Sequence, residues 1–190
     1  MKKNIILAGV GGQGILTIAS IIDQAAMQQG LFVKQAEVHG MSQRGGAVES
    51  HVRIADQPLF SDLIPKGEAD LILSIEPMES LRYLPFLSPK GLIVTASEPF
   101  VNIPDYPDKE LVLAEIIKHP HWIVDAEKEA RQAGNLKTYN MVMLGAASPY
   151  LGVSLKFLEN AITDRFSSKG EETVQMNLDA FRRGAALTKG

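Results

Sequence analysis

The sequence predicts an α/β fold, a Rossmann-like open and mainly parallel sheet with helices on both faces and a helical C-terminal part. Short β-rich runs alternate with longer helical ones up to about residue 133, which is typical of a parallel sheet. A glycine-rich turn stands between the first expected strand and the first expected helix. Since the chain has 190 residues, we expect a single domain over 1–190.

The elements follow in chain order. The apolar run at 4–9 predicts a buried strand, and the segment behind the glycine turn predicts a helix over 13–29. A second strand is expected at 32–38, and the alternation at 48–55 predicts an antiparallel strand. Short apolar runs and the stretches between them predict strands at 70–75, 91–96 and 122–125 and helices at 77–84, 109–118 and 126–133.

The remainder of the chain is predicted to be helical. The expected helices span 138–149, 155–165 and 171–187, and Thr138 is the expected N-cap of the first of them. The last helix carries one apolar stripe, formed by Val174, Leu178, Phe181 and Ala185. We expect this stripe to pack on the edge of the sheet, because nearly every surface helix has one; the alternative is a docking helix for a partner.

Composition excludes several classes of function. The chain has no cysteine, so it holds no disulfide, no zinc–thiolate site and no iron–sulfur cluster of its own. Its net charge is −3 and no run of like charges stands out, which argues against nucleic acid as a partner. The apolar runs are far shorter than the about 20 residues that span a membrane. A cytoplasmic location is therefore expected.

The glycine-rich turn is the most specific feature near the N-terminus. Gly9, Gly11 and Gly14 fit the G-x-G-x-x-G spacing, with Gly12 and Gln13 between them. The first glycine permits a tight turn, the second lets a phosphate approach the backbone, and the third lets the helix pack closely on the strand. The N–H groups of the first helical turn then form an anion site. These five residues are candidates for cofactor binding.

Three interpretations of this turn stay open. The first is binding of a phosphate or another anion, the second is a purely structural role in the strand-to-helix turn or in an interface, and the third is NAD(P) binding in a stand-alone oxidoreductase. The last needs an acidic residue about 20 positions further on, and Glu37 fits this loosely. It is no P-loop, because Ile15 and Leu16 follow the last glycine in place of Lys-Ser/Thr.

A second polar, glycine-rich loop spans 39–46. Arg44 is a fixed cation suited to a carboxylate or phosphate, and His39 and Ser42 could form a proton-transfer pair. We add His39, Ser42, Arg44 and Gly45 to the cofactor-binding candidates. Both loops are expected at the C-terminal ends of adjacent strands, where ligands gather in open α/β sheets.

These two loops together resemble a known family. The motif 9–14 with Thr17, the segment 37–46 and the segment 50–53 are similar to the gamma-type domain of 2-oxoacid:ferredoxin oxidoreductases, and among these to the small (beta) subunits of the indolepyruvate type. The segments 64–71, 76–83 and 140–145 have the same family character, so the resemblance covers about residues 4–185.

The resemblance implies a subunit role. Such an enzyme decarboxylates a 2-oxoacid on thiamine diphosphate, joins the acyl group to coenzyme A and passes electrons through iron–sulfur clusters to ferredoxin. The resemblance places the thiamine site and the clusters on a large (alpha) subunit, in agreement with the lack of cysteine here. Coenzyme A near the glycine loops is our own hypothesis. The isolated chain is expected to be inactive, and surface normally covered by its partner favours self-association.

Other candidate sites have simpler explanations. Glu76 and Glu79 could work as an acid–base pair, but at the start of a helix they are expected to favour its dipole. His119 and His121 flank a proline without a third metal ligand nearby. No catalytic or metal-binding residue is therefore assigned to this chain.

Overall fold

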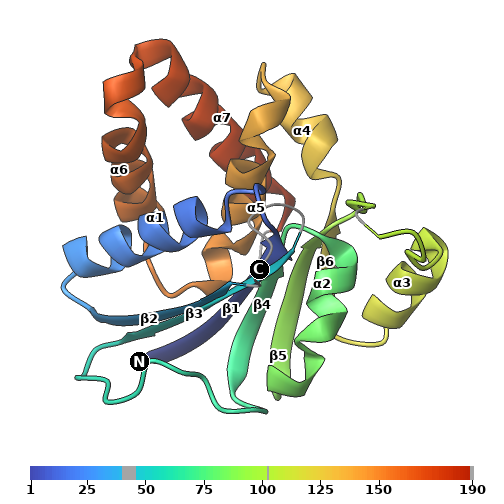
Figure 1. Cartoon of the computed structure of the whole chain (residues 1–190). Coiled ribbons are helices and arrows are strands. Elements are labelled where there is room, and N and C mark those ends of the chain that lie inside the picture. Colours follow the sequence, from blue (N-terminus) through green and yellow to red (C-terminus); the bar gives the residue numbers. More distant parts are fainter. Residues whose placement is uncertain (40–45, 102, 189–190) are drawn as a thin grey trace.

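The fold is built on one sheet. The structure is a computed structural model that describes residues 1–39, 46–101 and 103–188 (Figure 1). In these residues the sheet has six strands in the order β2-β3-β1-β4-β5-β6. The strands are β1 (Lys2–Val10), β2 (Phe32–His39), β3 (Ala47–Ala55), β4 (Ala69–Ser74), β5 (Leu87–Ala96) and β6 (His121–Val124).

The sheet is mostly parallel, as predicted. The strands β1, β4, β5 and β6 pair in parallel, whereas β3 runs antiparallel to both of its neighbours. The antiparallel expectation for 48–55 is confirmed. The expectation that the first two strands are adjacent is wrong, because β3 folds back as a hairpin on β2 and pairs with β1 along its whole length, from Lys2↔Ala55 to Val10↔Ala47.

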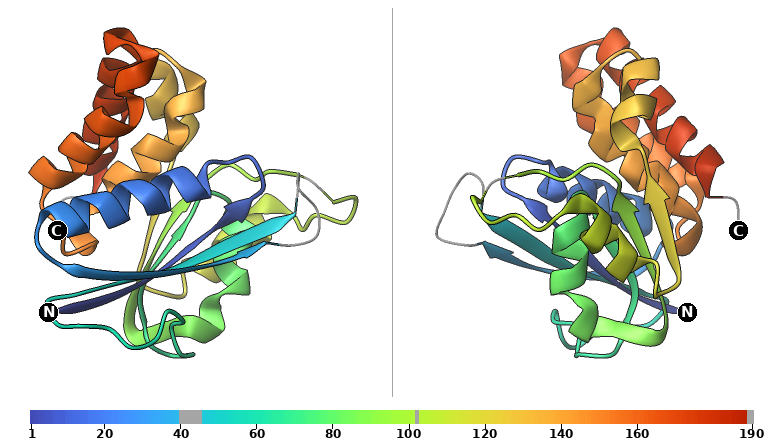
Figure 2. Two further views of the ribbon diagram at one scale, coloured as in Figure 1. Left: turned by 60° about the vertical axis from the view of Figure 1, so that its left-hand side comes forward. Right: turned by 90° about the vertical axis from the view of Figure 1, so that its right-hand side faces the viewer.

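Helices cover both faces of the sheet, which confirms the predicted fold class (Figure 2). One face carries α1 (Ile15–Gln28), α4 (Ala126–Gln132), α5 (Tyr139–Ala147), α6 (Leu155–Phe166) and α7 (Glu171–Leu187), and the other carries α2 (Pro77–Arg82) and α3 (Lys109–Ile116). Short 3-10 turns connect some of them, at Leu84–Phe86, Leu136–Thr138, Ser148–Tyr150 and Ser167–Lys169. No helix of the described residues is long and apolar enough to cross a membrane.

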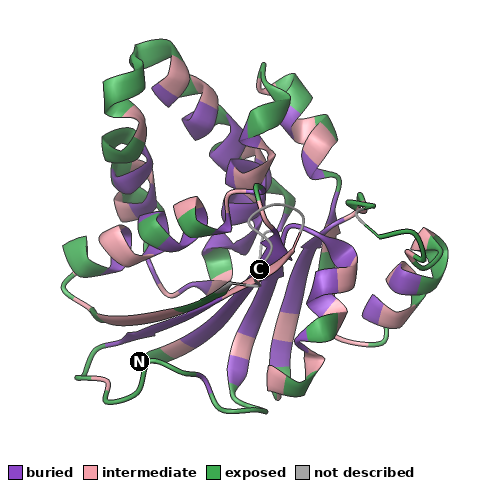
Figure 3. Cartoon of the chain, viewed as in Figure 1, coloured by how far each residue is buried: buried purple, intermediate pink, exposed green. Residues whose placement is uncertain are grey.

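The core alternates across β1. Ile5 and Leu7 belong to the cluster under α1 and the C-terminal helices, whereas Ile6 and Ala8 face the cluster under α2. All four side chains are fully buried, and Figure 3 shows the central strands as the buried centre of the molecule. This two-sided burial explains why the first strand reads as an unbroken apolar run.

Two glycines bring α5 and α7 into close contact. A Cβ on Gly145 would lie 2.0 Å from the Phe181 carbonyl oxygen, and one on Gly184 would lie 1.9 Å from the Val142 oxygen. The apolar stripe of α7 therefore packs on α5 and not on the sheet edge. Met141 belongs to the same buried core. The stripe is a packing surface, as expected, but its neighbour is a helix.

The starts of two helices differ from the prediction. The first helix begins at Ile15 and not at residue 13, because Gly14 adopts a left-handed conformation with φ 84°. Thr138 does occupy the N-cap position of α5, yet its hydroxyl donates to the Asn135 carbonyl oxygen at 2.7 Å instead of capping the helix. The hydroxyl is engaged by the preceding 3-10 turn at Leu136–Thr138, and the sequence pattern did not indicate this turn.

Candidate functional site

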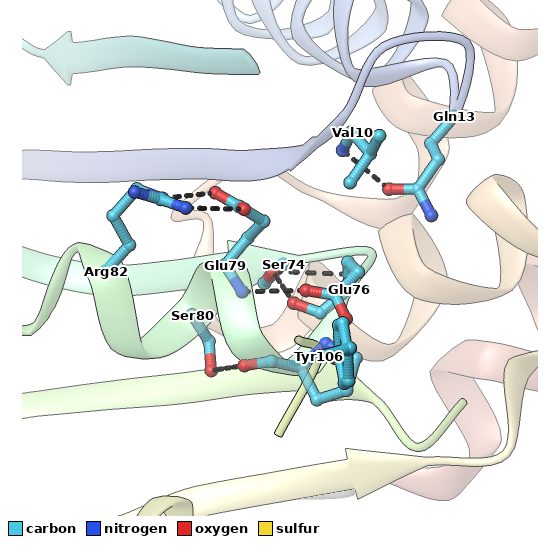
Figure 4. Close-up of polar contacts among 9 residues, drawn as sticks. Val10, Gln13, Ser74, Glu76, Glu79, Ser80, Arg82 and Tyr106 are labelled. Atoms are coloured by element: carbon cyan, nitrogen blue, oxygen red, sulfur yellow. Dashed lines mark hydrogen bonds and ion pairs between the residues drawn. The ribbon is translucent and has the colours of Figure 1, made fainter. Parts of the chain in front are cut away.

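The glycine-rich turn joins the C-terminal end of β1 to α1. Gln13 organises it: its side-chain oxygen accepts a hydrogen bond from the Val10 N–H at 2.7 Å, and its own N–H donates to the Val10 carbonyl at 3.1 Å (Figure 4). The Gln13 side chain is 8% exposed. A buried polar side chain thus closes the turn on itself and fixes the direction in which the helix leaves the strand.

The glycines of this turn are required for different structural reasons. A Cβ on Gly9 would lie 2.8 Å from the Gln13 side-chain oxygen and 2.9 Å from a methyl group of Ile15, so packing alone requires glycine there. Gly14 has φ 84°, and its Cβ would lie 2.5 Å from the Asn140 amide nitrogen. Gly12 has φ 100° and open space around it. The turn therefore needs these glycines structurally, and Gly12 faces outward.

A cavity of about 300 Å³ lies against the outer side of this turn and the start of α1. Its lining comprises Val10, Gly11, Gly12, Gly14, Ile15, Leu16 and Val48. No side chain caps the N-terminus of α1, and its first turn contains no acidic residue. The positive end of the helix dipole and the backbone N–H groups at its start therefore suit a negatively charged ligand.

A second cavity of about 220 Å³ lies where β4, β5 and β6 end. Gln13 lines it as well, together with Tyr139, whose hydroxyl donates to the Gln13 carbonyl oxygen at 3.5 Å. Its remaining lining is mostly apolar and includes Ile75, Ala96, Pro99, Phe100, Ala126 and Leu136, with Glu98 and Glu127. The two cavities are thus neighbours at the edge where ligands bind in open α/β sheets.

Glu76 organises the edge next to the second cavity (Figure 4). Its carboxylate caps α2 by accepting from the Glu79 N–H at 2.8 Å, and it also accepts from the Phe100 N–H at 3.4 Å and from the Tyr106 hydroxyl. The side chain is fully buried, and this burial raises the pKa of Glu76. One carboxylate therefore ties the segment around 100–106 to the start of α2.

Glu79 has a separate, structural role. It stands in the first turn of α2, and both its carboxylate oxygens accept from the Arg82 guanidinium, at 2.8 and 3.2 Å. Together with the capping bond of Glu76, this arrangement agrees with the expectation that both acids stabilise the start of the helix. The contact between Tyr106 and Glu76 was not predicted, because it joins residues that lie 30 positions apart and no local sequence pattern indicates it.

The second loop lies largely outside the described residues. This holds for Ser42, Arg44 and Gly45, and of His39 only the backbone at the end of β2 is described. The Gly11 N–H donates to the Gly46 carbonyl oxygen at 2.9 Å. The glycine turn therefore contacts the end of the second loop directly, even though the strands that they follow are not adjacent.

The position of Glu37 argues against the dinucleotide interpretation. In a dinucleotide-binding fold the acidic residue follows the parallel strand next to the first one. Here Glu37 lies on β2, and the antiparallel β3 separates β2 from β1. One Glu37 carboxylate oxygen accepts from the Gln35 amide at 2.6 Å. The glycine spacing is thus present without the strand order that gives it a ribose-binding acid.

The histidine pair His119 and His121 makes a local contact with the backbone. The His121 ring nitrogen Nδ1 lies 2.8 Å from the His119 carbonyl oxygen. Across the described ranges, no group of three or more His, Asp or Glu side chains is arranged to hold a metal ion.

Comparison with known proteins shows what the chain is similar to. The family model described as pyruvate ferredoxin/flavodoxin oxidoreductase matches residues 4–187. The indolepyruvate oxidoreductase subunit IorB of Thermococcus kodakarensis is 38% identical, over 100% of this chain and 98% of the relative. Its counterpart from Archaeoglobus fulgidus is 39% identical, over 97% of this chain and 94% of the relative.

Solved structures share the fold. The 2-oxoglutarate:ferredoxin oxidoreductase of Magnetococcus marinus superposes with a TM-score of 0.80 at 26% identity over 98% of this chain, which spans 31% of that longer chain. A pyruvate oxidoreductase subunit from Thermotoga maritima superposes with a TM-score of 0.73 over 99% of this chain and 97% of that one, at 24% identity.

The relatives are subunits of oxidoreductase complexes, which does not support the alternative of a stand-alone NAD(P)-dependent enzyme. The match extends over nearly the whole chain, from the glycine turn to α7. The chain therefore belongs to the pyruvate ferredoxin/flavodoxin oxidoreductase family, as a small subunit of the 2-oxoacid:ferredoxin oxidoreductase type.

Proposed function

We propose that this chain is the small subunit of an indolepyruvate-type oxidoreductase. The complex would decarboxylate indolepyruvate or another arylpyruvate oxidatively, form the acyl-coenzyme A product and pass the electrons to ferredoxin. The observation that carries this proposal is the full-length similarity, at 38–39% identity, to proteins named as indolepyruvate oxidoreductase subunits. Relatives named as gamma subunits of pyruvate and ketoisovalerate oxidoreductases are only 28% identical.

The division of labour follows from the residues present. Without cysteine the chain offers no thiolate ligand for an iron–sulfur cluster, so in this proposal a large (alpha) subunit supplies the clusters. The resemblance to the family implies that the same subunit binds the thiamine diphosphate. Thiamine diphosphate supplies the carbanion chemistry of decarboxylation when it is bound there. The whole chain, 1–190, acts as one gamma-type domain in this proposal, and its own contribution is binding and positioning.

The glycine turn is the part of the chain that we assign to coenzyme A. Gln13 holds the turn closed, Gly12 faces outward, and the uncapped start of α1 presents N–H groups to the cavity of about 300 Å³. These features fit a phosphate group of the coenzyme. The site in this proposal comprises Gly9, Gly11, Gly12, Gln13 and Gly14, with His39, Ser42, Arg44 and Gly45 added from the sequence.

Leu16 provides a direct test of this assignment. It lines the cavity in the first turn of α1 and is 42% exposed, so a carboxylate there repels an anion without disturbing the core. In the complex of this chain with its large subunit, we expect Leu16→Glu to weaken coenzyme A binding about ten-fold or more. Calorimetry under anaerobic conditions measures the affinity.

Two controls separate charge from shape and position. Leu16→Gln changes the side chain without adding charge, and Ser20→Glu adds the same charge one turn further along α1, at an exposed position outside the cavity. Both are expected to bind coenzyme A within about two-fold of the native complex, since the effect of an added charge falls off beyond the first turn. If Leu16→Glu behaves like Ser20→Glu, the glycine turn does not bind the coenzyme.

A further inference from the structure

A polar groove lies on the other side of the glycine turn from the cavity assigned to coenzyme A. It has a volume of about 250 Å³ and lies between the starts of α1 and α5 and the turn from α6 to α7. Thr17 and Asn140 line it on one side, and Lys137, Lys169 and Thr173 line it on the others. Three segments that are distant in the sequence therefore contribute polar side chains to one groove.

The charge of this groove is positive and unopposed. Neither Lys137 nor Lys169 forms an ion pair with another described residue, and no carboxylate is part of the lining. The Lys169 ammonium lies 5.5 Å from the centre of the Phe166 ring, a cation–π contact that keeps it at the groove. In a chain of net charge −3, two such lysines mark a place that attracts an anion.

A second groove of the same molecule that also holds two cations differs in its charge. The groove beside α7 that holds Arg182 and Arg183 also holds Asp179, and both arginines pair with glutamates, at 2.7 Å to Glu159 and 3.0 Å to Glu129. Those cations are already neutralised by structural partners. The lysine groove instead offers the Thr17 hydroxyl and the Asn140 amide, which can donate to a bound anion but do not neutralise the lysines, whereas the Thr173 hydroxyl already donates to the Lys169 carbonyl oxygen.

The groove is joined to the glycine turn through two residues. Asn140 reaches Gly14 so closely that a Cβ on this glycine would lie 2.5 Å from the Asn140 amide nitrogen. Thr17 directly follows Leu16, which lines the other cavity, so the first turn of α1 lines both. A ligand with two separate phosphate groups matches this arrangement.

We propose that the lysine groove is a second anion subsite, which takes a phosphate monoester group. This inference rests on the proposed function. Coenzyme A carries a pyrophosphate and, apart from it, a phosphate monoester on its ribose. With the pyrophosphate at the start of α1, Lys137 and Lys169 bind the ribose phosphate, and Asn140 and Thr17 stand between the two subsites.

The test compares two ligands that differ only in this phosphate. Dephospho-coenzyme A lacks the monoester and keeps the pyrophosphate. Calorimetry on the anaerobic complex with its large subunit measures both affinities at one fixed ionic strength, because binding to lysines depends on salt. We expect the native complex to bind coenzyme A about ten-fold or more tightly than the dephospho form, since each charged hydrogen bond contributes appreciably.

The variant Lys137→Ala/Lys169→Ala should abolish this preference. Its affinity for coenzyme A should fall about ten-fold or more, to that of the dephospho form, whereas binding of the dephospho form should stay within about two-fold. The charge-matched control is Lys90→Ala/Lys156→Ala, which removes two exposed lysines outside the groove. It should keep the native preference. Thermal unfolding of each complex shows that the variants are folded.

The outcomes separate this inference from the proposed function. If the lysine variant loses affinity for both ligands equally, or for neither, the groove is no phosphate subsite, and coenzyme A binding at the glycine turn can still stand. If Leu16→Glu lowers the affinity for both ligands while the lysine variant lowers only the affinity for coenzyme A, both assignments hold. If neither ligand binds to the native complex, both are wrong.

Discussion

Asp23 on α1 has a partly buried carboxyl group whose charged form is destabilised in the folded chain. Its Oδ1 atom is buried and has no hydrogen-bond partner among the described residues. Burial, and secondarily the neighbouring charge of Glu37, raise the pKa of this carboxyl to about 7 from an ordinary value of 3.8. Replacing it by the isosteric asparagine, Asp23→Asn, removes the charge and keeps the shape. We therefore expect the variant to be more stable than the native chain at neutral and alkaline pH.

The sign and size follow from proton linkage. The native state binds this proton more tightly than the unfolded state, so the native stability falls as the pH rises from about 4 to about 7 and then levels off. The full shift corresponds to about 4 kcal/mol. The carboxyl remains partly in contact with water, and asparagine has its own desolvation cost. We therefore expect Asp23→Asn to raise the free energy of unfolding by about 2 kcal/mol at pH 8. Near pH 4 the difference should be close to zero.

Urea unfolding followed by circular dichroism, at about pH 4.5 and about pH 8, measures these free energies. Asp164→Asn is the matched control for the loss of one negative charge. Asp164 is exposed and accepts from the side-chain amides of Gln24, at 2.7 Å, and Gln28, at 3.2 Å, so its loss should weaken the α1–α6 contact slightly. Equal stabilities of the Asp23→Asn and native chains at pH 8 would refute the argument, and so would a less stable variant there.

Two further predictions concern packing. Gly184→Ala should destabilise the chain by about 3 kcal/mol in urea unfolding, because its Cβ would lie 1.9 Å from the Val142 carbonyl oxygen and force α5 and α7 apart. Arg53→Met should cost about 2–4 kcal/mol and speed proteolysis in the loop 56–68, since the buried Arg53 guanidinium donates to the carbonyl oxygens of Ser61 at 2.9 Å and Leu63 at 3.1 Å.

Each packing prediction has a matched control. Ala186→Gly changes an exposed position of α7 and should cost only about 1 kcal/mol, through helix propensity. Lys66→Met removes an exposed charge from the loop that Arg53 holds and should leave its proteolysis rate unchanged. A native-like stability of Gly184→Ala would mean that the two helices are less tightly packed than described. An unchanged cleavage rate in Arg53→Met would mean that other contacts hold the loop.

The elements of the fold were predictable because their sequence signals are local. The first strand is buried on both sides and reads as an apolar run that stops at the glycines, and the last helix begins and ends as predicted, at Glu171 and Leu187. The order of the strands was not predictable in the same way. Whether β3 pairs with β1 as well as β2 depends on which sheet edge is free in the folded molecule, and alternation along 48–55 carries no such information.

The candidate site likewise has features that a local sequence pattern predicts and contacts that it does not. The positions of Gly9 and Gly14 at a tight strand-to-helix turn follow from the G-x-G-x-x-G spacing, and the structure places them there. The contacts of Asn140 with Gly14 and of Tyr106 with Glu76 join segments that are 126 and 30 positions apart, which no local pattern encodes. The lysine groove was missed for this reason: Lys137 and Lys169 lie in separate turns that only the folding of α5, α6 and α7 brings together.

The central claim is that the chain works as the small subunit of an arylpyruvate-oxidising complex. Anaerobic affinity purification from its native cells, with mass spectrometry of the bound protein and an assay of arylpyruvate-dependent electron transfer, tests this most directly. We predict an equimolar large subunit that contains clustered cysteines and thiamine diphosphate, with coenzyme A-dependent activity in the complex and none in the chain alone. A chain that is recovered alone with a bound nicotinamide nucleotide, or that oxidises substrate without a partner, would contradict the account.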